Sequence, residues 1–393
     1  MKIILQVFLL IAVIACSEKV QNKEHISFDK TNGNFNKFFN KEQEYNIPTK
    51  FNDDIKLLNI SKIYTLANGN FLISDVMMPS LLIVSRNGEL IKVVGKKGNG
   101  PGEFISLIDF IYDENNDEII TLDFLQNAIN LYNNFKFIKK IHLAFEHRFP
   151  GQILKCKDGT IIISALRNLA TGSSKNNYTF LPFSENSYLN IYNSKYKLVR
   201  SFLNPSKKYN ENMIPFARPQ LGNYAPSAIL EDNKIITMKQ EGFDEIFIAE
   251  CSGKITNHFI VHEPSFVEFN FSLVKEHKLI NHRSNFKKEK IGEIIASYSS
   301  PVSINVLGKY VLVTIMDPYD NYFPQFSVLG SDKRTYHLDI FKYKNGELIP
   351  LIGGIKMKQK IVGVTANNSI LCIDRRFKQD PEKITIKQYK LRL

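Results

Sequence analysis

The chain has 393 residues, of which 44% are hydrophobic and 23% are charged. This composition is typical of a globular protein and excludes a disordered chain. The formal net charge of +12 is spread over the whole length, with no Arg-rich helix and no nucleic-acid-binding motif, so we predict no nucleic-acid partner.

Residues 1–15 have the pattern of a signal peptide. Lys2 is followed by an apolar run, Ile3 to Ile14, that is too short to span a bilayer comfortably. Val13 to Cys16, VIAC, resemble the lipobox of bacterial lipoproteins. The resemblance implies cleavage before Cys16, lipidation of that cysteine and anchoring to a membrane of the bacterial cell envelope. Ser17 to Lys19 are compatible with the outer membrane, and the alternative is an ordinary secretory signal with an incidental cysteine.

Residues 16–46 are rich in Asn, Lys and Glu. We interpret them as a tether that also holds a candidate ring-closing strand. The remaining chain, residues 47–393, carries an internal repeat.

A unit of four strands recurs six times in residues 47–393. In each copy the first two strands are joined by a tight turn that contains Gly, Asn or Asp, and in the five complete copies a second such turn joins the last two. The first two strands of the copies read SKIYTL and FLISD, LIDFIY and EIITLD, GQILKC and TIIISA, SAILE and KIITMK, VSINV and YVLVTI, and IVGVT and SILCID. This rhythm predicts an all-β protein, a six-bladed β-propeller with four-stranded antiparallel blades.

The sixth copy reaches Leu393 without a fourth strand. An open blade edge favours aggregation, so we expect a strand from the N-terminal stretch to close the ring. Our first choice is His25 to Asp29, and the second is Ile47 to Phe51. Helical spacing of apolar residues appears only in Lys287 to Ser299, which predicts one short helical insertion.

The segment Gly98 to Phe104, GNGPGEF, resembles a family of bacterial six-bladed β-propeller lipoproteins related to NHL-repeat propellers. Ile47-Pro48, Asn59 to Ile63 and Val93 to Gly98 share the resemblance. The resemblance implies the propeller fold and an envelope location, and it implies no activity. The glycines fit no phosphate-binding motif, so we interpret GNGPGEF as a tight crossover between blades.

Four long connections interrupt the rhythm: Leu166 to Ser187, Asn204 to Pro226, His262 to Ser300 and Met316 to Thr335. By our alignment two of them join second to third strands and two join consecutive blades. In an antiparallel blade all four project from the same face, where loops held on a rigid scaffold commonly bind ligands.

The candidate ligand-binding residues are Arg218, Tyr224, Lys239, Tyr319 and Tyr322. Aromatic rings and a guanidinium are suited to a glycan, a peptide or a partner protein. The alternative for the aromatic residues is a small satellite core that fixes the insertions to the ring.

The second strands of three copies end in a carboxylate: Asp75, Asp123 and Asp374. Carboxylates that converge from several blades suit a hard cation, so we consider a Ca2+ site, as in related six-bladed lactonases and lyases. The alternative, which we favour, is a local turn in which Asp accepts hydrogen bonds from nearby backbone amides. No other cofactor is predicted.

Cys156, Cys251 and Cys372 are far apart and form no C-x-x-C pair, so we expect buried thiols rather than disulfides. No catalytic set can be singled out, although acids that pair only in space would escape notice. We therefore favour a non-catalytic binding or scaffold role through the loop-bearing face. The alternative function is a calcium-dependent hydrolase or lyase acting at the central channel.

Overall fold

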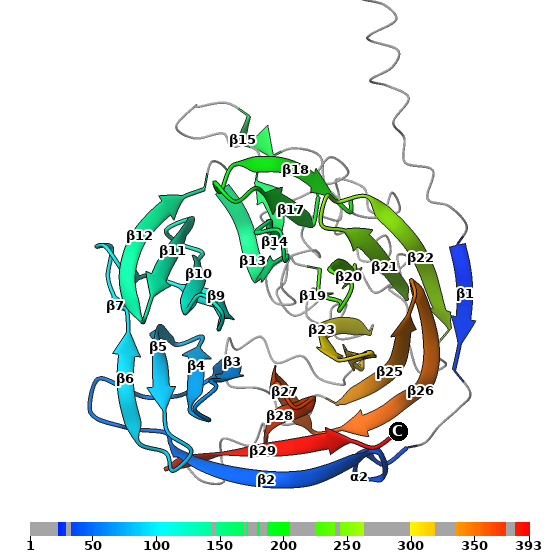
Figure 1. Cartoon of the computed structure of the whole chain (residues 1–393), viewed down its shortest axis with the longest axis horizontal. Helices are drawn as coiled ribbons and strands as arrows, with labels where there is room; N and C mark the ends of the chain where they lie inside the picture. The colour runs from blue at the N-terminus through cyan, green and yellow to red at the C-terminus, as the bar shows by residue number, and fades with distance from the viewer. Residues whose placement is uncertain are drawn as a thin grey trace, which may run out of the picture.

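A computed structural model describes residues 23–28, 33–143, 146–168, 170–171, 179–180, 187–204, 225–239, 244–262, 299–318, 335–374 and 382–393. Six antiparallel sheets surround a common axis in the order of the six predicted copies (Figure 1). The predicted six-bladed propeller is confirmed.

Each blade has four strands, and the first strand named for each blade lies nearest the axis. Blade 1 contains β3 (Ile60–Thr65), β4 (Phe71–Asp75), β5 (Met78–Val84) and β6 (Leu90–Val94). Blade 2 contains β9 (Leu107–Asp113), β10 (Glu118–Asp123), β11 (Ala128–Asn133) and β12 (Lys136–His142). Blade 3 contains β13 (Glu146–Lys155), β14 (Ile161–Asn168), β17 (Leu189–Tyr192) and β18 (Leu198–Phe202).

Blade 4 contains β19 (Ser227–Ile229), β20 (Lys234–Met238), β21 (Glu245–Glu250) and β22 (Ile255–His262). Blade 5 contains β23 (Ser300–Leu307), β24 (Tyr310–Met316), β25 (Tyr336–Lys344) and β26 (Glu347–Met357). Blade 6 contains β27 (Gln359–Val364), β28 (Ser369–Asp374), β29 (Lys383–Leu391) and an N-terminal strand, β2 (Phe39–Pro48). Two further pairs lie outside the blades: β7 (Lys96–Lys97) with β8 (Glu103–Phe104), and β15 (Ala170–Thr171) with β16 (Thr179–Phe180).

The core of the propeller lies between the blades. Successive residues of a strand point to opposite faces, so a middle strand must be apolar on both faces when a blade is covered on both sides. In β4, Leu72 packs into a cluster shared with blade 2, and Ile73 packs into a cluster shared with blade 6. The first turns of blades 1 and 6 use Gly69 (φ 85°) and Asn368 (φ 57°), residue types that tolerate this left-handed backbone.

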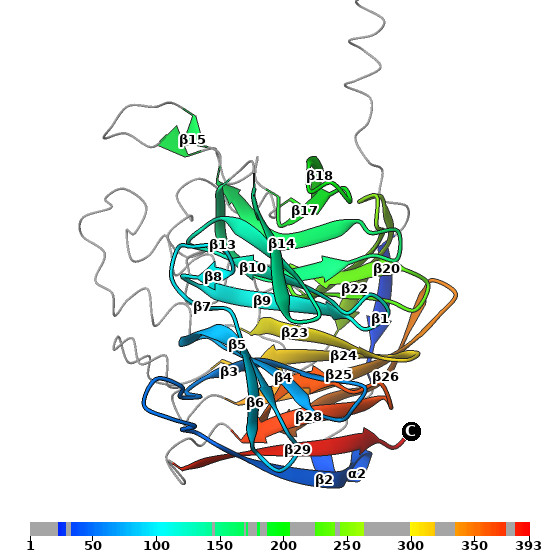
Figure 2. The same ribbon diagram turned by 60° about the vertical axis from the view of Figure 1, so that its left-hand side comes forward.

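The ring is closed by an N-terminal strand, as predicted, but that strand is β2. It pairs antiparallel with β29 from Phe39↔Leu391 to Pro48↔Lys383, and Figures 1 and 2 show the two strands side by side. The first choice, His25 to Asp29, was wrong, and the second overlaps β2 only at Ile47 and Pro48. The burial pattern gives the physical reason, because β2 presents core residues such as Ile47 to the blade interface.

The segment around His25 forms β1 (Lys23–Ser27), which pairs parallel with β22 on the outside of blade 4. Its strand residues are largely exposed, but the following Phe28 is buried against Phe341 of blade 5, with ring centroids 4.9 Å apart. Further along, Phe35 packs between blades 5 and 6 at the start of α2 (Phe35–Phe38). Much of the predicted tether is therefore part of the fold.

The helix of the described chain is α2, a single short turn. The predicted helical insertion, Lys287 to Ser299, lies outside the described residues except for its last position. In the parts of the chain that the structure covers, no helix is long and apolar enough to cross a membrane.

One expectation about the thiols was wrong. Cys156 and Cys251 form a disulfide across a sequence separation of 95 residues, with Cα atoms 6.4 Å apart. It joins the β13–β14 turn of blade 3 to the β21–β22 turn of blade 4. Cys372 is a buried free thiol, as expected. Disulfides persist in oxidising compartments, which indicates a location outside the cytoplasm.

Candidate functional site

The two faces of the propeller differ in their connections. The first turn of every blade and the third turn of blades 1 to 5 are short and lie on one face, which we call the short-turn face. The four long connections join β14 to β17, β18 to β19, β22 to β23 and β24 to β25. Antiparallel pairing places all four on the opposite, loop-bearing face, as the sequence predicted.

The innermost strands carry a ring of polar side chains near this face. From blade 1 to blade 6 the ring consists of Lys62, Asp109, Gln152, Ser227, Ser303 and Lys360. In the same order, these residues pair with residues near the loop-side ends of the second strands, namely Ser74, Leu122, Ser164, Thr237, Thr314 and Ile373. Each innermost strand enters from a crossover on the loop-bearing face, so the ring lies near that mouth of the channel.

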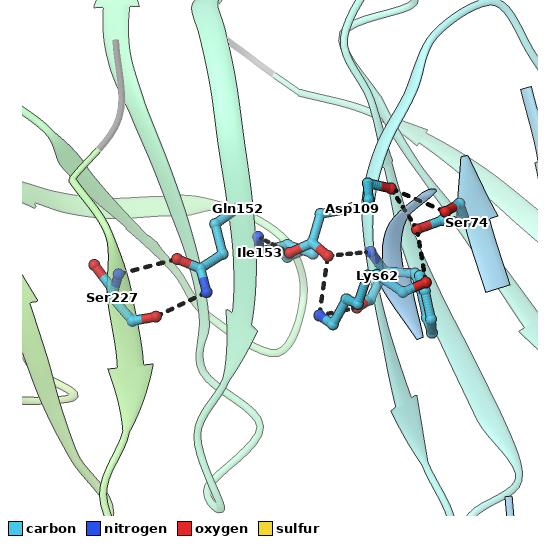
Figure 3. A network of polar contacts seen from close by, with 8 residues as sticks. Lys62, Ser74, Asp109, Gln152, Ile153 and Ser227 are labelled. Carbon is cyan, nitrogen blue, oxygen red and sulfur yellow. Dashed lines mark hydrogen bonds and ion pairs between the residues drawn. The ribbon is translucent and has the colours of Figure 1, made fainter. Parts of the chain in front are cut away.

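Several members of the ring bind the next blade (Figure 3). The Nζ of Lys62 lies 2.9 Å from Asp109 Oδ1 and donates to the carbonyl of Phe110 at 2.7 Å. The other oxygen of Asp109 accepts from the backbone N–H of Ile153 at 3.0 Å. Blades 1, 2 and 3 are thus joined through one buried carboxylate.

The same pattern continues on both sides of these three blades. The side-chain amide of Gln152 donates to the carbonyl of Ser227 at 2.7 Å and accepts from its N–H at 3.0 Å, which joins blades 3 and 4. The Nζ of Lys360 donates to the carbonyl of Ile60 at 2.7 Å, which joins blades 6 and 1. The ring is therefore partly structural.

A cavity of about 420 Å³ lies among the innermost strands. Strands of blades 1, 2, 3, 5 and 6 and Pro226, which directly precedes β19 of blade 4, form its wall. Its polar lining includes Lys62, Asp109, Gln152, Ser303 and Lys360. This volume is within the range of small-molecule sites, which run from about 300 to 1,000 Å³. The loop-side mouth of the channel is the candidate functional site.

The predicted calcium ligands do not converge in the structure. Asp75 is buried and accepts hydrogen bonds from the backbone N–H groups of Leu58, Asn59 and Met77 at 2.8, 2.6 and 2.8 Å. Burial raises its pKa above the ordinary value, and the amide hydrogen bonds oppose that rise. The carboxylate therefore fixes the crossover into blade 1 and the following turn.

Asp123 has the same role in blade 2, where it accepts from the N–H groups of Ile105 at 2.7 Å and Gln126 at 3.0 Å. Asp374 is exposed and lies 2.6 Å from the Nζ of Lys387. In the part of the chain that the structure describes, no group of three or more His, Cys, Asp or Glu is placed to hold a metal ion. These contacts correspond to the backbone-capping alternative, and Ca2+ binding stays a prediction.

Lys239 is largely buried in blade 4 and does not line the cavity. Its Nζ lies 3.9 Å from Glu245 and 5.1 Å from the centre of the Phe247 ring. Glu245 is also 3.2 Å from His258 Nε2 and 3.5 Å from Lys23 of β1. Burial alone would raise the pKa of Glu245, but these three cationic or ionisable partners outweigh burial and lower it to about 2.

This cluster predicts an acid-sensitive contribution to stability. Because the folded pKa of Glu245 is below its unfolded value, its contribution is present above about pH 4.5 and is lost as the pH falls towards 2. We expect Glu245→Gln to lower the free energy of unfolding by about 1–3 kcal/mol at pH 7. In urea titrations at pH 7, 5 and 3 the difference from wild type should shrink with the pH, whereas the exposed-site control Glu250→Gln should show little difference throughout.

The GNGPGEF segment forms the crossover from blade 1 to blade 2, as predicted. Its strand β8 pairs in parallel with β7, which directly precedes the segment, and Glu103 Oε2 accepts from the N–H of Gly100 at 2.8 Å. A Cβ atom added to Gly98 would lie 2.0 Å from the same carboxylate oxygen. The segment's own glutamate therefore occupies the place that an anion would take in a phosphate-binding loop.

The remaining candidate ligand residues, Arg218, Tyr224, Tyr319 and Tyr322, and the lipidation candidate Cys16 lie outside the described residues. Their predicted roles stay predictions.

Comparison with known proteins assigns the family. A family model described as DUF5128, a six-bladed β-propeller, matches residues 16–215, slightly more than half of the chain. The chain belongs to the DUF5128 family. Among the curated proteins, none matches this chain.

Solved structures share the fold of this DUF5128 propeller. A Bacteroides fragilis protein named as exported is 13% identical with a TM-score of 0.59, and the alignment covers 94% of this chain and 100% of the other. A member of the DUF4221 family from Bacteroides vulgatus is 11% identical with a TM-score of 0.61, covering 90% and 98%. At these identities the likeness shows the fold alone.

The polar ring of the DUF5128 propeller was missed in the sequence. The ends of the second strands, where Asp75 and Asp123 stand out, do not reveal it. Aligning the first strands instead places Lys62, Asp109 and Lys360 at one position, each one residue before a buried apolar residue. A charged residue at an interior strand position is the signal that would have identified the channel lining.

Proposed function

We propose that this propeller is a non-catalytic binding protein of the bacterial cell envelope. It is anchored through a lipid on Cys16, and it binds a glycan, a peptide or a partner protein at the loop-bearing face. The observation that carries the proposal is the coincidence of two features on one face. The four long connections emerge there, and the polar residues that line the channel lie near the same ends of the innermost strands.

The described surface supports the same face. Leu58, Val76, Met77 and Leu125 are exposed apolar residues, at 43%, 47%, 51% and 61%, and all of them lie in crossovers or second connections. The exposed large apolar residues of the described chain include none from the first or third turns of a blade. The other exposed large apolar residues of the described chain lie on outer strands or at the C-terminal Leu393, so among the connections they are confined to the loop-bearing face, which favours a binding surface there.

The proposed anchor limits how the propeller approaches the membrane. Residue 23, the first of β1, follows Cys16 by seven residues, and an extended chain spans at most about 3.5 Å per residue. A lipid on Cys16 would hold the outer edge of blade 4 within about 25 Å of the bilayer.

Site-specific photocrosslinking in intact envelopes tests the binding face. A benzoylphenylalanine replaces Met77 on the loop-bearing face or, as a matched control in the same blade, the exposed Asn87 in the β5–β6 turn. We expect a discrete crosslinked product from position 77 and none from position 87. Equal crosslinking from both positions would contradict the proposal. So would turnover of a small substrate by a protein that gives no crosslinked species.

The calcium-dependent hydrolase or lyase is the alternative prediction. The contacts of Asp75 and Asp123 do not favour it, and the response of the melting temperature to a chelator tests it directly.

A further inference from the structure

The charges of the channel do not balance among the described residues. Lys62 and Asp109 form an ion pair, with 2.9 Å between nitrogen and oxygen, so together they are neutral. Lys360 lines the same cavity and has no carboxylate partner within ion-pair distance among the described residues. Its Nζ donates to one carbonyl oxygen, that of Ile60, at 2.7 Å. Among the residues that the structure describes, one positive charge in the channel has no counter-charge in contact.

Burial dominates the electrostatics of Lys360 and lowers the pKa of its ammonium group to about 8. The carboxylate of Asp75 acts from a distance and raises that pKa by a smaller amount. Its oxygens are occupied by the amides of Leu58, Asn59 and Met77, so it does not turn towards the lysine. An ammonium group in this environment is stabilised by any anion that enters the cavity.

The blade next to that of Lys360, blade 5, supplies neutral hydrogen-bonding groups. Blade 5 contributes Ser303 and Asn305, whose side chains bond to each other at 3.2 Å. It also contributes Thr314, which is buried and whose hydroxyl has no hydrogen-bond partner among the described residues. A ligand beside Lys360 therefore meets one cation and several neutral polar groups.

We infer that the channel mouth binds a small organic anion through a carboxylate that pairs with Lys360. A single unbalanced cation matches one negative charge, which favours a carboxylate over a phosphate dianion. The cavity of about 420 Å³ accommodates a small organic acid or the acidic end of a larger ligand. This assignment of the ligand's charge rests on the proposed binding role of the loop-bearing face.

The experiment compares acetate with acetamide, which has nearly the same size and shape but no charge. Backbone amide signals of β27 are followed by NMR while each probe is added to the full mature protein at constant ionic strength in chloride. We expect saturable shifts with acetate, weaker shifts with inorganic phosphate and none with acetamide. Equal shifts with acetate and acetamide, or no saturable shift with acetate, would overturn the inference.

Variants assign the binding to one side chain. Lys360→Met keeps the volume of the side chain and removes its charge, and we expect it to weaken acetate binding at least tenfold. Lys358→Met is the matched control, because it removes an exposed lysine two residues away on the same face and should change the affinity less than twofold. Lys360→Arg keeps the cation and should retain binding. Loss of acetate binding in all three variants would contradict a role for Lys360.

The pH dependence supplies a second readout. Acetate stays ionised above pH 6, and Lys62 is held by Asp109, so the affinity should fall as Lys360 loses its proton around pH 8. A constant affinity from pH 7 to pH 9.5 would contradict the inference. If acetate does not bind but a crosslink forms from position 77, the assignment of a negatively charged ligand is wrong and the proposed binding face is retained.

Discussion

Reduction of the Cys156–Cys251 disulfide is expected to lower the free energy of unfolding by about 4 kcal/mol. The bond closes a loop of 95 residues, and constraining the unfolded chain over that length contributes about 4–5 kcal/mol in the chain-entropy model. For a chain of this size we expect the melting temperature to fall by about 5–10 °C. Thermal unfolding with and without a reducing agent measures the difference.

The control for this prediction is the double variant Cys156→Ser with Cys251→Ser, which leaves no lone thiol at either turn. It should melt close to the reduced wild-type protein, and the reducing agent should not change it further. Peptide mapping without reduction should recover the 156–251 linkage. Recovery of both cysteines as free thiols would show that the two turns are not joined.

Replacing Asp75 is expected to be nearly as costly. Asp75→Ala leaves three backbone N–H groups, those of Leu58, Asn59 and Met77, without their acceptor in a buried place. Each unsatisfied buried donor costs about 1–3 kcal/mol, so we expect a loss of about 3 kcal/mol or more in urea unfolding. Asp374→Ala is the matched control, since Asp374 is exposed at the equivalent position of blade 6, and its loss should stay below about 1 kcal/mol.

The metal dependence of stability separates backbone capping from calcium binding. If Asp75 holds only amides, treatment with EDTA leaves the melting temperature of the wild-type protein unchanged, and added Ca2+ does not raise it. A melting temperature that falls on chelation and recovers with Ca2+ would instead support the calcium-dependent alternative.

The repeat made the ring predictable because each copy shows its turns and buried second strand locally. Turns such as those at Gly69 and Asn368 require residues that tolerate a positive φ, so they mark the strand ends in any copy. The face of the four long connections followed from antiparallel pairing alone. These features depend on neighbours in the chain, which the sequence displays directly.

The rest depends on contacts between blades, which the sequence does not display. Cys156 and Cys251 are paired because two turns of adjacent blades meet at the short-turn face. The closing strand was placed wrongly because β1 and β2 are both largely polar outer strands, and the packing of Phe39, Tyr45 and Ile47 in the core distinguishes β2. The polar ring was missed because Lys62 and Asp109 become partners only across a blade interface.

A crystal structure of the protein purified from its native host tests the central claim, that a ligand binds at the loop-side mouth of the channel. We predict electron density for a bound molecule there, with an acidic group within hydrogen-bond distance of Lys360. Density for a ligand on the short-turn face, with water alone beside Lys360, would contradict the account.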